Sequence, residues 1–216
     1  MNLILLGLPG AGKGTQAKII SQEYNLSHIA TGDIFRRLIK QRTTLGLRAE
    51  KYIKEGKLVP DEDAVRILKD EISRIDISSG FVIDGFPRTL NQAEILTKFL
   101  EGLDAKPDLV FFIDVDPDEL VHRITERRVC LNCGNTYHLK HNPPQNDGLC
   151  DLCGEKLIQR NDDREETVKK RILINLKKIK EIVSYYKERG ILKTVSGDTI
   201  EGLYGEIKKT IEVNLL

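Results

Sequence analysis

Residues 2–15 read Asn-Leu-Ile-Leu-Leu-Gly-Leu-Pro-Gly-Ala-Gly-Lys-Gly-Thr, an aliphatic run that ends at Gly7 and continues into a glycine-rich turn. A short apolar run with an abrupt glycine stop is typical of a buried strand in a parallel sheet. Residues 15–24, which follow the turn, have a helical pattern. The stretch therefore predicts a strand, a loop and a helix in immediate succession.

A glycine-rich loop in this position predicts a phosphate-binding site. Glycines let the backbone wrap closely around a phosphate with its N–H groups pointing inward, and the helix N-terminus adds the positive end of its dipole. Lys13 supplies a charge for the β- and γ-phosphates, and Thr15 supplies a hydroxyl near Mg²⁺. Gly14 stands where Ser or Thr is usual, so the hydroxyl comes one residue later. A glycine turn without a ligand is the alternative, and the placement between strand and helix disfavours it.

The rest of the chain continues the alternation of strands and helices. Further buried strands are predicted at 81–84, 109–115 and 192–195, while residues 29–31 are too few to assign. Helical patterns cover 32–56, in two pieces broken at Gly46 and Gly56, a segment from Asp61, and 89–101, 118–128, 163–189 and 200–213. Residues 129–159 change in composition and predict a small β-rich insert. The alternation predicts an α/β fold whose parallel sheet is covered by helices on both faces.

The composition excludes several classes of protein. The chain has 216 residues, between one and two domains at roughly 150 residues per domain. Its 34 Lys and Arg against 33 Asp and Glu give a net charge of +1, which argues against a general nucleic-acid-binding or membrane-surface protein. No apolar run reaches the ~18 residues of a spanning helix, and residues 1–6 lack the features of a signal peptide. A cytoplasmic location is therefore expected.

Two later segments place an arginine beside a glycine turn and predict a second phosphate site. They are Thr31-Gly32-Asp33 with Arg36, and Asp84-Gly85-Phe86-Pro87-Arg88. Arginine binds phosphate through bidentate hydrogen bonds, and a carboxylate at a strand end, such as Asp84, can hold Mg²⁺ through water. Without the phosphate loop, ordinary surface charge would be the favoured interpretation of either segment.

All four cysteines lie within 24 residues, as the Cys-x-x-Cys pairs Cys130/Cys133 and Cys150/Cys153. Sixteen residues separate the pairs, and a glycine follows each, a spacing typical of a tetrahedral structural zinc site. Four thiolates close the coordination sphere, so the metal is expected to be structural and not catalytic. Two disulfides are the alternative, which a reducing compartment disfavours. The spacing alone does not separate zinc from cobalt or iron, which also accept thiolates.

Together these segments closely resemble adenylate kinase over essentially the whole chain. The resembling stretches are Gly7–Thr15, Thr31-Gly32-Asp33 with Arg36, Lys57-Leu58-Val59, Asp84–Arg88, Gln92, Arg123–Arg128, Arg160–Asp163, Glu165-Glu166-Thr167 and Arg171. The resemblance implies a P-loop NTPase fold with a parallel five-stranded sheet flanked by helices. It further implies a core of residues 1–29, 60–126 and 164–216, an α-helical AMP-binding insert at 30–59 and a small β-rich, zinc-binding lid at 127–163.

The resemblance also implies the roles of individual residues. ATP is expected at Gly10, Ala11, Gly12, Lys13, Gly14, Thr15, Arg123, Arg127, Thr136, Tyr137 and, by a loose match, Thr199. AMP is expected at Thr31, Arg36, Lys57, Leu58, Val59, Gly85, Phe86, Pro87, Arg88, Gln92, Arg160 and Arg171. The catalytic residues are expected to be Lys13, Arg88, Arg127, Arg160 and Arg171, with Asp84 associated with Mg²⁺.

The activity that the resemblance implies is ATP + AMP ⇌ 2 ADP, with Mg²⁺, by a monomer that binds neither nucleic acid nor membrane. Another nucleoside monophosphate kinase, acting on UMP, CMP or GMP, is the nearest alternative, and Thr31 together with the cysteine-bearing lid favours AMP. A zinc-ribbon nucleic-acid-binding module is disfavoured by the near-neutral charge. A switch GTPase is disfavoured because the chain has no Asn-Lys-x-Asp or Thr-Lys-x-Asp segment.

Overall fold

The computed structural model describes residues 1–215 and has an α/β core built on one parallel sheet. The five strands of the sheet are β1 (Asn2–Leu6), β2 (Ser27–Ala30), β3 (Phe81–Asp84), β4 (Leu109–Ile113) and β8 (Leu192–Val195). The helices are α1 (Lys13–Glu23), α2 (Thr31–Lys40), α3 (Thr44–Lys54), α4 (Asp61–Ile72), α5 (Leu90–Glu101), α6 (Pro117–Thr125), α7 (Glu165–Glu188) and α8 (Ile200–Leu215). The predicted α/β class and the parallel five-stranded sheet are confirmed.

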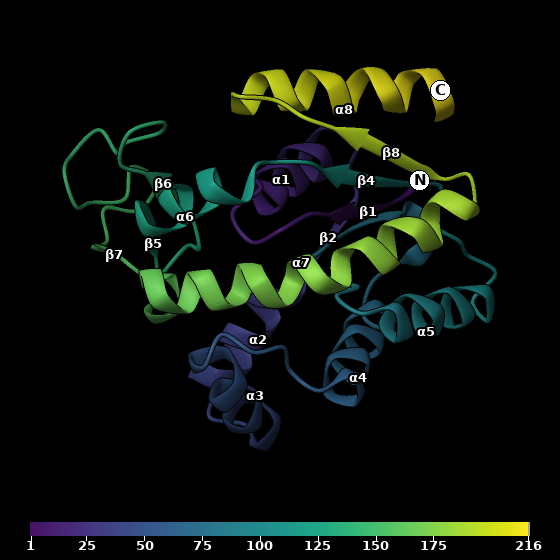
Figure 1. Ribbon diagram of the computed structural model, residues 1–216, viewed down its shortest axis with the longest axis horizontal. Coiled ribbons are helices and arrows are strands. Elements are labelled where there is room, and N and C mark those ends of the chain that lie inside the picture. The colour runs from purple at the N-terminus through teal and green to yellow at the C-terminus, as the bar shows by residue number, and fades with distance from the viewer. Residues whose placement is uncertain (216) are drawn as a thin grey trace.

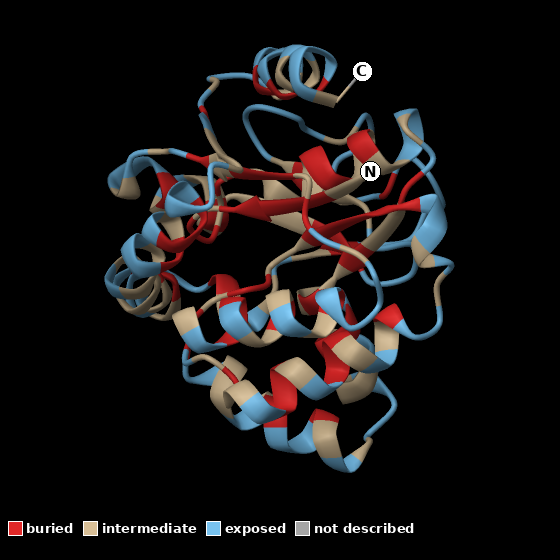
Figure 2. Cartoon of the chain, turned by 90° about the vertical axis from the view of Figure 1, so that its right-hand side faces the viewer, coloured by how far each residue is buried: buried red, intermediate tan, exposed pale blue. Residues whose placement is uncertain are grey.

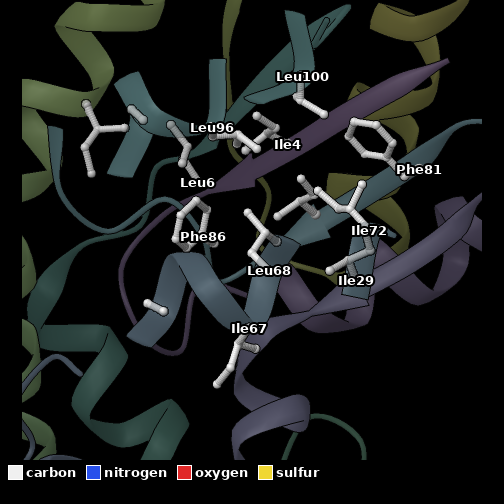
Figure 3. Close-up of a cluster of buried hydrophobic side chains, with 14 of the residues drawn as sticks. Ile4, Leu6, Ile29, Ile67, Leu68, Ile72, Phe81, Phe86, Leu96 and Leu100 are labelled. Carbon is white, nitrogen blue, oxygen red and sulfur yellow. The ribbon is translucent and has the colours of Figure 1, made fainter. Parts of the chain in front are cut away.

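Helices cover the sheet on both faces, with α8 on one side and α7 and α5 on the other (Figure 1). Along β1, Leu3 and Leu5 belong to one core cluster and Ile4 and Leu6 to the other, because successive side chains of a strand point to opposite faces. Figure 3 shows Ile4 and Leu6 among side chains of α4 and α5, and Figure 2 shows the buried strands at the centre of the molecule. Burial on both faces explains why the strand sequences are continuously apolar.

The strand order β2-β3-β1-β4-β8 places β1 between β3 and β4. The chain thus fills one half of the sheet with β2 and β3, then crosses to the other half with β4 and β8. Open parallel sheets bind ligands at the carboxyl ends of their strands, at the point where the strand order reverses. Here β1 runs into the glycine-rich loop, and Leu5 near its end is in register with Asp84 at the end of β3. The topology therefore brings the loop and Asp84 to one edge.

A second, antiparallel sheet of three strands lies beyond the carboxyl ends of the main strands (Figure 1). It contains β5 (Arg127–Cys130), β6 (Thr136–His138) and β7 (Leu157–Ile158), in the order β6-β5-β7. Its core is a cluster of four buried side chains, Cys130, Tyr137, Cys150 and Leu157. Because so small a sheet buries little apolar surface, it needs another source of stability. The predicted β-rich insert is confirmed.

Three differences from the predicted elements go beyond one or two residues at an end. The predicted helix break at Gly46 is wrong, because Thr43 caps α3 by accepting a hydrogen bond from the Gly46 N–H at 3.0 Å, so the glycine lies inside the helix. The predicted helix 118–128 ends at Thr125, because residues 127–130 pair with the other lid strands. Residues 27–30, only partly considered in the sequence, form the edge strand β2.

The helices carry charged residues along their exposed faces. Among the helices of residues 1–215, none is both long enough and apolar enough to cross a membrane.

We expect Gly46→Ala to destabilise the protein, because a Cβ on Gly46 would lie 2.2 Å from the carbonyl oxygen of Leu38 in α2. Overpacking of this kind lowers the free energy of unfolding by about 1–3 kcal/mol. The matched control is Gly205→Ala in α8, where a Cβ meets nothing within 4 Å and the helical alanine gains roughly 0.5–1 kcal/mol. Urea unfolding measures both variants. An unchanged midpoint for Gly46→Ala would contradict the close approach of α2 and α3.

Candidate active site

The glycine-rich loop between β1 and α1 has a backbone that only glycine adopts readily. Gly10 and Gly12 have φ values of 87° and 91°, in the left-handed region. A Cβ on Gly10 would also lie 2.7 Å from Cγ1 of Ile124 in α6. Lys13, the first residue of α1, folds back over the loop, and its Nζ donates hydrogen bonds to the carbonyl oxygens of Gly7 and Leu8, both at 2.9 Å. The loop and the ammonium group thus form one unit.

Lys13 is held in a desolvated position. Burial lowers the pKa of Lys13 to about 8, from an ordinary value of 10.5. The carboxylate of Asp84 opposes this shift, whereas repulsion by Arg88, Arg171 and Arg127 adds to it. Keeping this amine charged in the free protein therefore carries an electrostatic penalty, and a bound anion would relieve it.

A cleft with a volume of about 470 Å³ opens at this edge of the sheet. The charged side chains that line it are eight cations, Lys13, Lys18, Arg36, Arg88, Arg123, Arg127, Arg160 and Arg171, and four carboxylates, Asp33, Asp84, Asp198 and Glu201. The whole chain carries a net charge of +1. The positive charge is thus concentrated in the cleft, which selects a polyanionic ligand.

Two adjacent carboxylates hold two of these arginines. Arg127 donates two hydrogen bonds to the buried carboxylate of Asp163, at 2.9 and 2.6 Å. Arg171 donates to both the backbone carbonyl and the side chain of Asp162, each at 2.9 Å. Burial by itself would raise the pKa of Asp162, but Arg171 and the other arginines lower it, so the carboxylate stays ionised. The pairs fix the guanidinium groups at the junction between β5 and α7.

Two other arginines, Arg88 and Arg160, make no salt bridge within residues 1–215. Arg88 Nε donates to the carbonyl oxygen of Gly85 at 2.7 Å. Burial lowers the pKa of both arginines, and neighbouring arginines lower it further, Arg171 for Arg88 and Arg36 for Arg160. Guanidinium groups in this state gain most from the bidentate hydrogen bonds of a phosphate.

Asp84 lies against the phosphate loop at the end of β3. A Cβ on Gly14 would lie 3.2 Å from Oδ2 of Asp84, so a larger residue at position 14 would crowd the carboxylate. This contact gives a physical reason for glycine at the place where other phosphate loops carry Ser or Thr. The hydroxyl of Thr15, which follows Gly14, lines the same cleft as the carboxylate of Asp84. Oxygen ligands of these two kinds are the ones that Mg²⁺ prefers.

A smaller cavity adjoins the cleft on the side of α2 and α3. Its lining combines the start of α2, the segment 56–59 that precedes α4, and the segment between β3 and α5. The residues expected to bind AMP that line it are Thr31, Arg36, Lys57, Leu58, Val59, Gly85, Phe86, Arg88, Gln92 and Arg171. Pro87 and Arg160 line the larger cleft. Both cavities share Arg36, Arg88 and Arg171.

The residues expected to bind ATP all line the larger cleft: Gly10, Ala11, Gly12, Lys13, Gly14, Thr15, Arg123, Arg127, Thr136, Tyr137 and Thr199. Besides Lys13 and Arg127, two of them also form contacts outside the cleft. Arg123 is paired with Glu119 one helical turn earlier, at 2.8 Å. The Tyr137 hydroxyl accepts a hydrogen bond from the backbone N–H of Asp151 at 2.8 Å and lies 3.5 Å from the sulfur of Cys150. The tyrosine hydroxyl therefore faces the cysteines.

The four cysteine sulfurs form one cluster, all within 4.8 Å of one another. Cys130 and Cys153 lie 3.4 Å apart and Cys133 and Cys150 lie 3.5 Å apart, far longer than the 2.05 Å or so of a disulfide. A tetrahedron of sulfurs about 2.3 Å from a zinc ion has edges of about 3.8 Å, so the donor set fits zinc in type, number and spacing. The two Cys-x-x-Cys turns lie at the same end of this sheet, because Cys130 at the end of β5 pairs with Leu157 at the start of β7.

Three further residues of the site are not indicated by the sequence patterns. Gln16 in α1 is buried and donates to the carbonyl oxygen of Ile200 at 2.9 Å, which ties the segment around Thr199 to the phosphate-loop helix. Asn175 in α7 lines both cavities. Asp61 accepts a hydrogen bond from Gln92, 31 residues away. Each one contributes through a tertiary contact, which neither local spacing nor residue type indicates.

Comparison with known proteins agrees with this geometry. A sequence model of the family described as "Adenylate kinase" matches residues 5–191. A protein named "Adenylate kinase" from Clostridium acetobutylicum is 49% identical over 212 residues, which cover 98% of this chain and 99% of that protein. One from Staphylococcus epidermidis is 51% identical over 197 residues, covering 91% and 92%. One from Clostridium botulinum is 48% identical over 212 residues, 98% of each chain.

The matched region contains the phosphate loop, the arginine-rich cleft with its two cavities and the four-cysteine sheet. A match of this length and identity shows common descent as well as a common fold. The chain belongs to the adenylate kinase family.

Proposed function

We propose that the cleft catalyses the reversible reaction ATP + AMP ⇌ 2 ADP, with Mg²⁺, and so helps to balance the adenine nucleotides of the cell. One observation carries the proposal. Two adjoining cavities share Arg36, Arg88 and Arg171, so two phosphate-bearing ligands would meet at the same three guanidinium groups. A hydrolase needs only one such ligand, whereas a phosphotransferase needs a donor and an acceptor side by side.

The chemistry demands little more from the chain than positioning and charge. A phosphate oxygen of AMP attacks the γ-phosphorus of ATP in line, and the bond to the β-γ bridging oxygen breaks. Lys13 and the loop N–H groups bind the donor phosphates, while Arg88, Arg127, Arg160 and Arg171 surround the oxygens on which charge accumulates. When bound, Mg²⁺ neutralises phosphate charge, and Asp84 and Thr15 would hold it. No general base is required, because the attacking phosphate is already an anion.

Another nucleoside monophosphate kinase is the second candidate. Thr31 and Gln92 in the smaller cavity favour AMP as the acceptor. Their hydroxyl and amide groups can form hydrogen bonds with the donor and acceptor groups on the edge of an adenine base. A panel of AMP, GMP, UMP and CMP with ATP as donor separates the two.

We expect the purified protein to form ADP from ATP only when AMP is supplied. We also expect Lys13→Ala to lower kcat by about 10²–10³-fold, which is the usual effect of removing a group that stabilises charge in the transition state. A coupled assay of ADP formation measures both. Lys69→Ala, at a half-buried position of α4 that lies over the ring of Phe99 and lines neither cavity, is the matched control and keeps its activity. The absence of product with AMP would overturn the function, and near-normal turnover by Lys13→Ala would overturn the role of the lysine.

We also propose that residues 127–163 form a lid that zinc stiffens and that residues 30–59 form a second mobile insert, each closing over its own nucleotide. Closure of such a lid excludes water, which would otherwise compete with AMP for the phosphoryl group. The hydrophobic cluster of the lid contains four buried side chains, so a metal held by Cys130, Cys133, Cys150 and Cys153 would supply much of its stability. A cytoplasmic monomer is proposed, in accord with four reduced thiols gathered for a metal.

We expect Cys133→Ser to lower both the zinc content and the Tm, while turnover at low temperature persists, because four thiolates leave no open position for catalysis. Elemental analysis measures the zinc content, and thermal unfolding with and without a chelator measures the Tm. The control is Leu131→Ser in the same turn, since this leucine is 63% exposed and bears no metal ligand. Loss of turnover together with an unchanged melting curve would contradict a structural role.

A further inference from the structure

The carboxylate of Asp61 accepts three side-chain hydrogen bonds beside the smaller cavity. Asp61 is the first residue of α4, directly after the segment 57–60. Its Oδ2 accepts from Thr89 Oγ1 and from Asn91 Nδ2, both at 2.9 Å, and its Oδ1 accepts from Gln92 Nε2 at 2.8 Å. Partial burial by itself would raise the pKa of Asp61, but these hydrogen bonds lower it. The group is therefore an anion, which can only accept hydrogen bonds.

The amide of Gln92 is held from both sides. Its Nε2 donates to Asp61, and its Oε1 accepts from the backbone N–H of Arg88 at 2.7 Å. The residue is only 2% exposed and lines the smaller cavity. Rotating the amide by half a turn would place its oxygen against the carboxylate of Asp61 and its NH₂ group against the N–H of Arg88. Both contacts would be repulsive, so the side chain has one orientation.

This orientation has a consequence for the base of the acceptor nucleotide. After the two contacts, Oε1 retains one acceptor position and Nε2 retains one N–H. The edge of adenine presents an amino donor beside a ring-nitrogen acceptor, which matches an amide oxygen beside an amide N–H. Hypoxanthine presents a carbonyl acceptor beside a ring N–H donor, and would match only the reversed amide. The two bases have the same size, so the hydrogen-bonding pattern alone separates them.

We propose that Asp61 is a positioning residue that sets the purine preference of the acceptor site by holding the amide of Gln92 in one orientation. The inference rests on the proposed function, since it concerns the base of the acceptor. Asp61 acts through Gln92 and does not itself touch the nucleotide. The carboxylate also joins the N-termini of α4 and α5, because Thr89 caps α5 by accepting from the N–H of Gln92. Its removal therefore affects stability as well as preference, and the test must separate the two.

The test compares kcat/KM for AMP and for IMP in wild type, Asp61→Asn and Glu62→Gln, with ATP as donor. The amide introduced by Asp61→Asn can turn either its oxygen or its NH₂ group toward Gln92, so the orientation of the glutamine is set by the N–H of Arg88 alone, at almost constant side-chain volume. Glu62→Gln removes the same charge from the first turn of α4, but Glu62 is exposed and has no hydrogen bond to the α5 cap. Thermal unfolding of each variant establishes that the protein is folded at the assay temperature.

We expect the AMP:IMP ratio to fall about tenfold in Asp61→Asn, the effect of losing one hydrogen bond to a charged group. KM for AMP should rise while KM for ATP stays constant, and Glu62→Gln should keep the wild-type ratio. If Asp61→Asn does not fold, Asp61→Ser serves instead, since it removes the carboxylate and leaves a hydroxyl that can either accept from Gln92 or donate to it. A folded variant of Asp61 with a ratio within about twofold of wild type overturns the proposal. A wild type inactive with AMP overturns the proposed function instead.

Discussion

Positive charge gathered in a desolvated cleft at the carboxyl end of a parallel sheet is the constraint on which this structure depends. Eight Lys and Arg side chains line the cleft against four carboxylates, although the chain as a whole is nearly neutral. Bringing like charges together away from water is unfavourable, and this is why the pKa values of Lys13 and Arg88 are lowered. The fold must hold these groups in place until phosphates arrive.

Three features of the fold hold the cationic side chains of the cleft in place. The topology delivers the phosphate loop and Asp84 to neighbouring strand ends, and the loop carbonyls hold the ammonium of Lys13. Asp162 and Asp163 hold Arg171 and Arg127 where the lid joins α7. Arg88 and Arg160 form no salt bridge among the residues described, so their charge is available to the ligand. Preorganised charge of this kind stabilises a transition state without reorganisation when the reaction occurs.

The features predicted from the sequence are those that local patterns determine. An apolar run, a glycine stop and a helix lie within a few residues, so strand, loop and Lys13 could be assigned together; the Cys-x-x-Cys spacing likewise indicated a four-sulfur cluster. The break at Gly46 was wrong because the cap supplied by Thr43 outweighs the poor helix propensity of glycine. Gln16 and Asp61 were missed because their partners lie 184 and 31 residues away. Site assignments that came from the family resemblance remain predictions.

The charge of Lys13 offers the most direct test of this account. Its pKa of about 8 in the free protein means that it is protonated at pH 7 and mostly neutral at pH 9, and a bound triphosphate favours the protonated form. Titration calorimetry with ATP in two buffers of different ionisation enthalpy measures the proton uptake, and Lys13→Arg, which stays protonated, supplies the baseline. We predict an excess uptake of close to one proton at pH 9 and close to none at pH 7. Equal uptake at the two pH values would contradict a desolvated lysine that awaits phosphate.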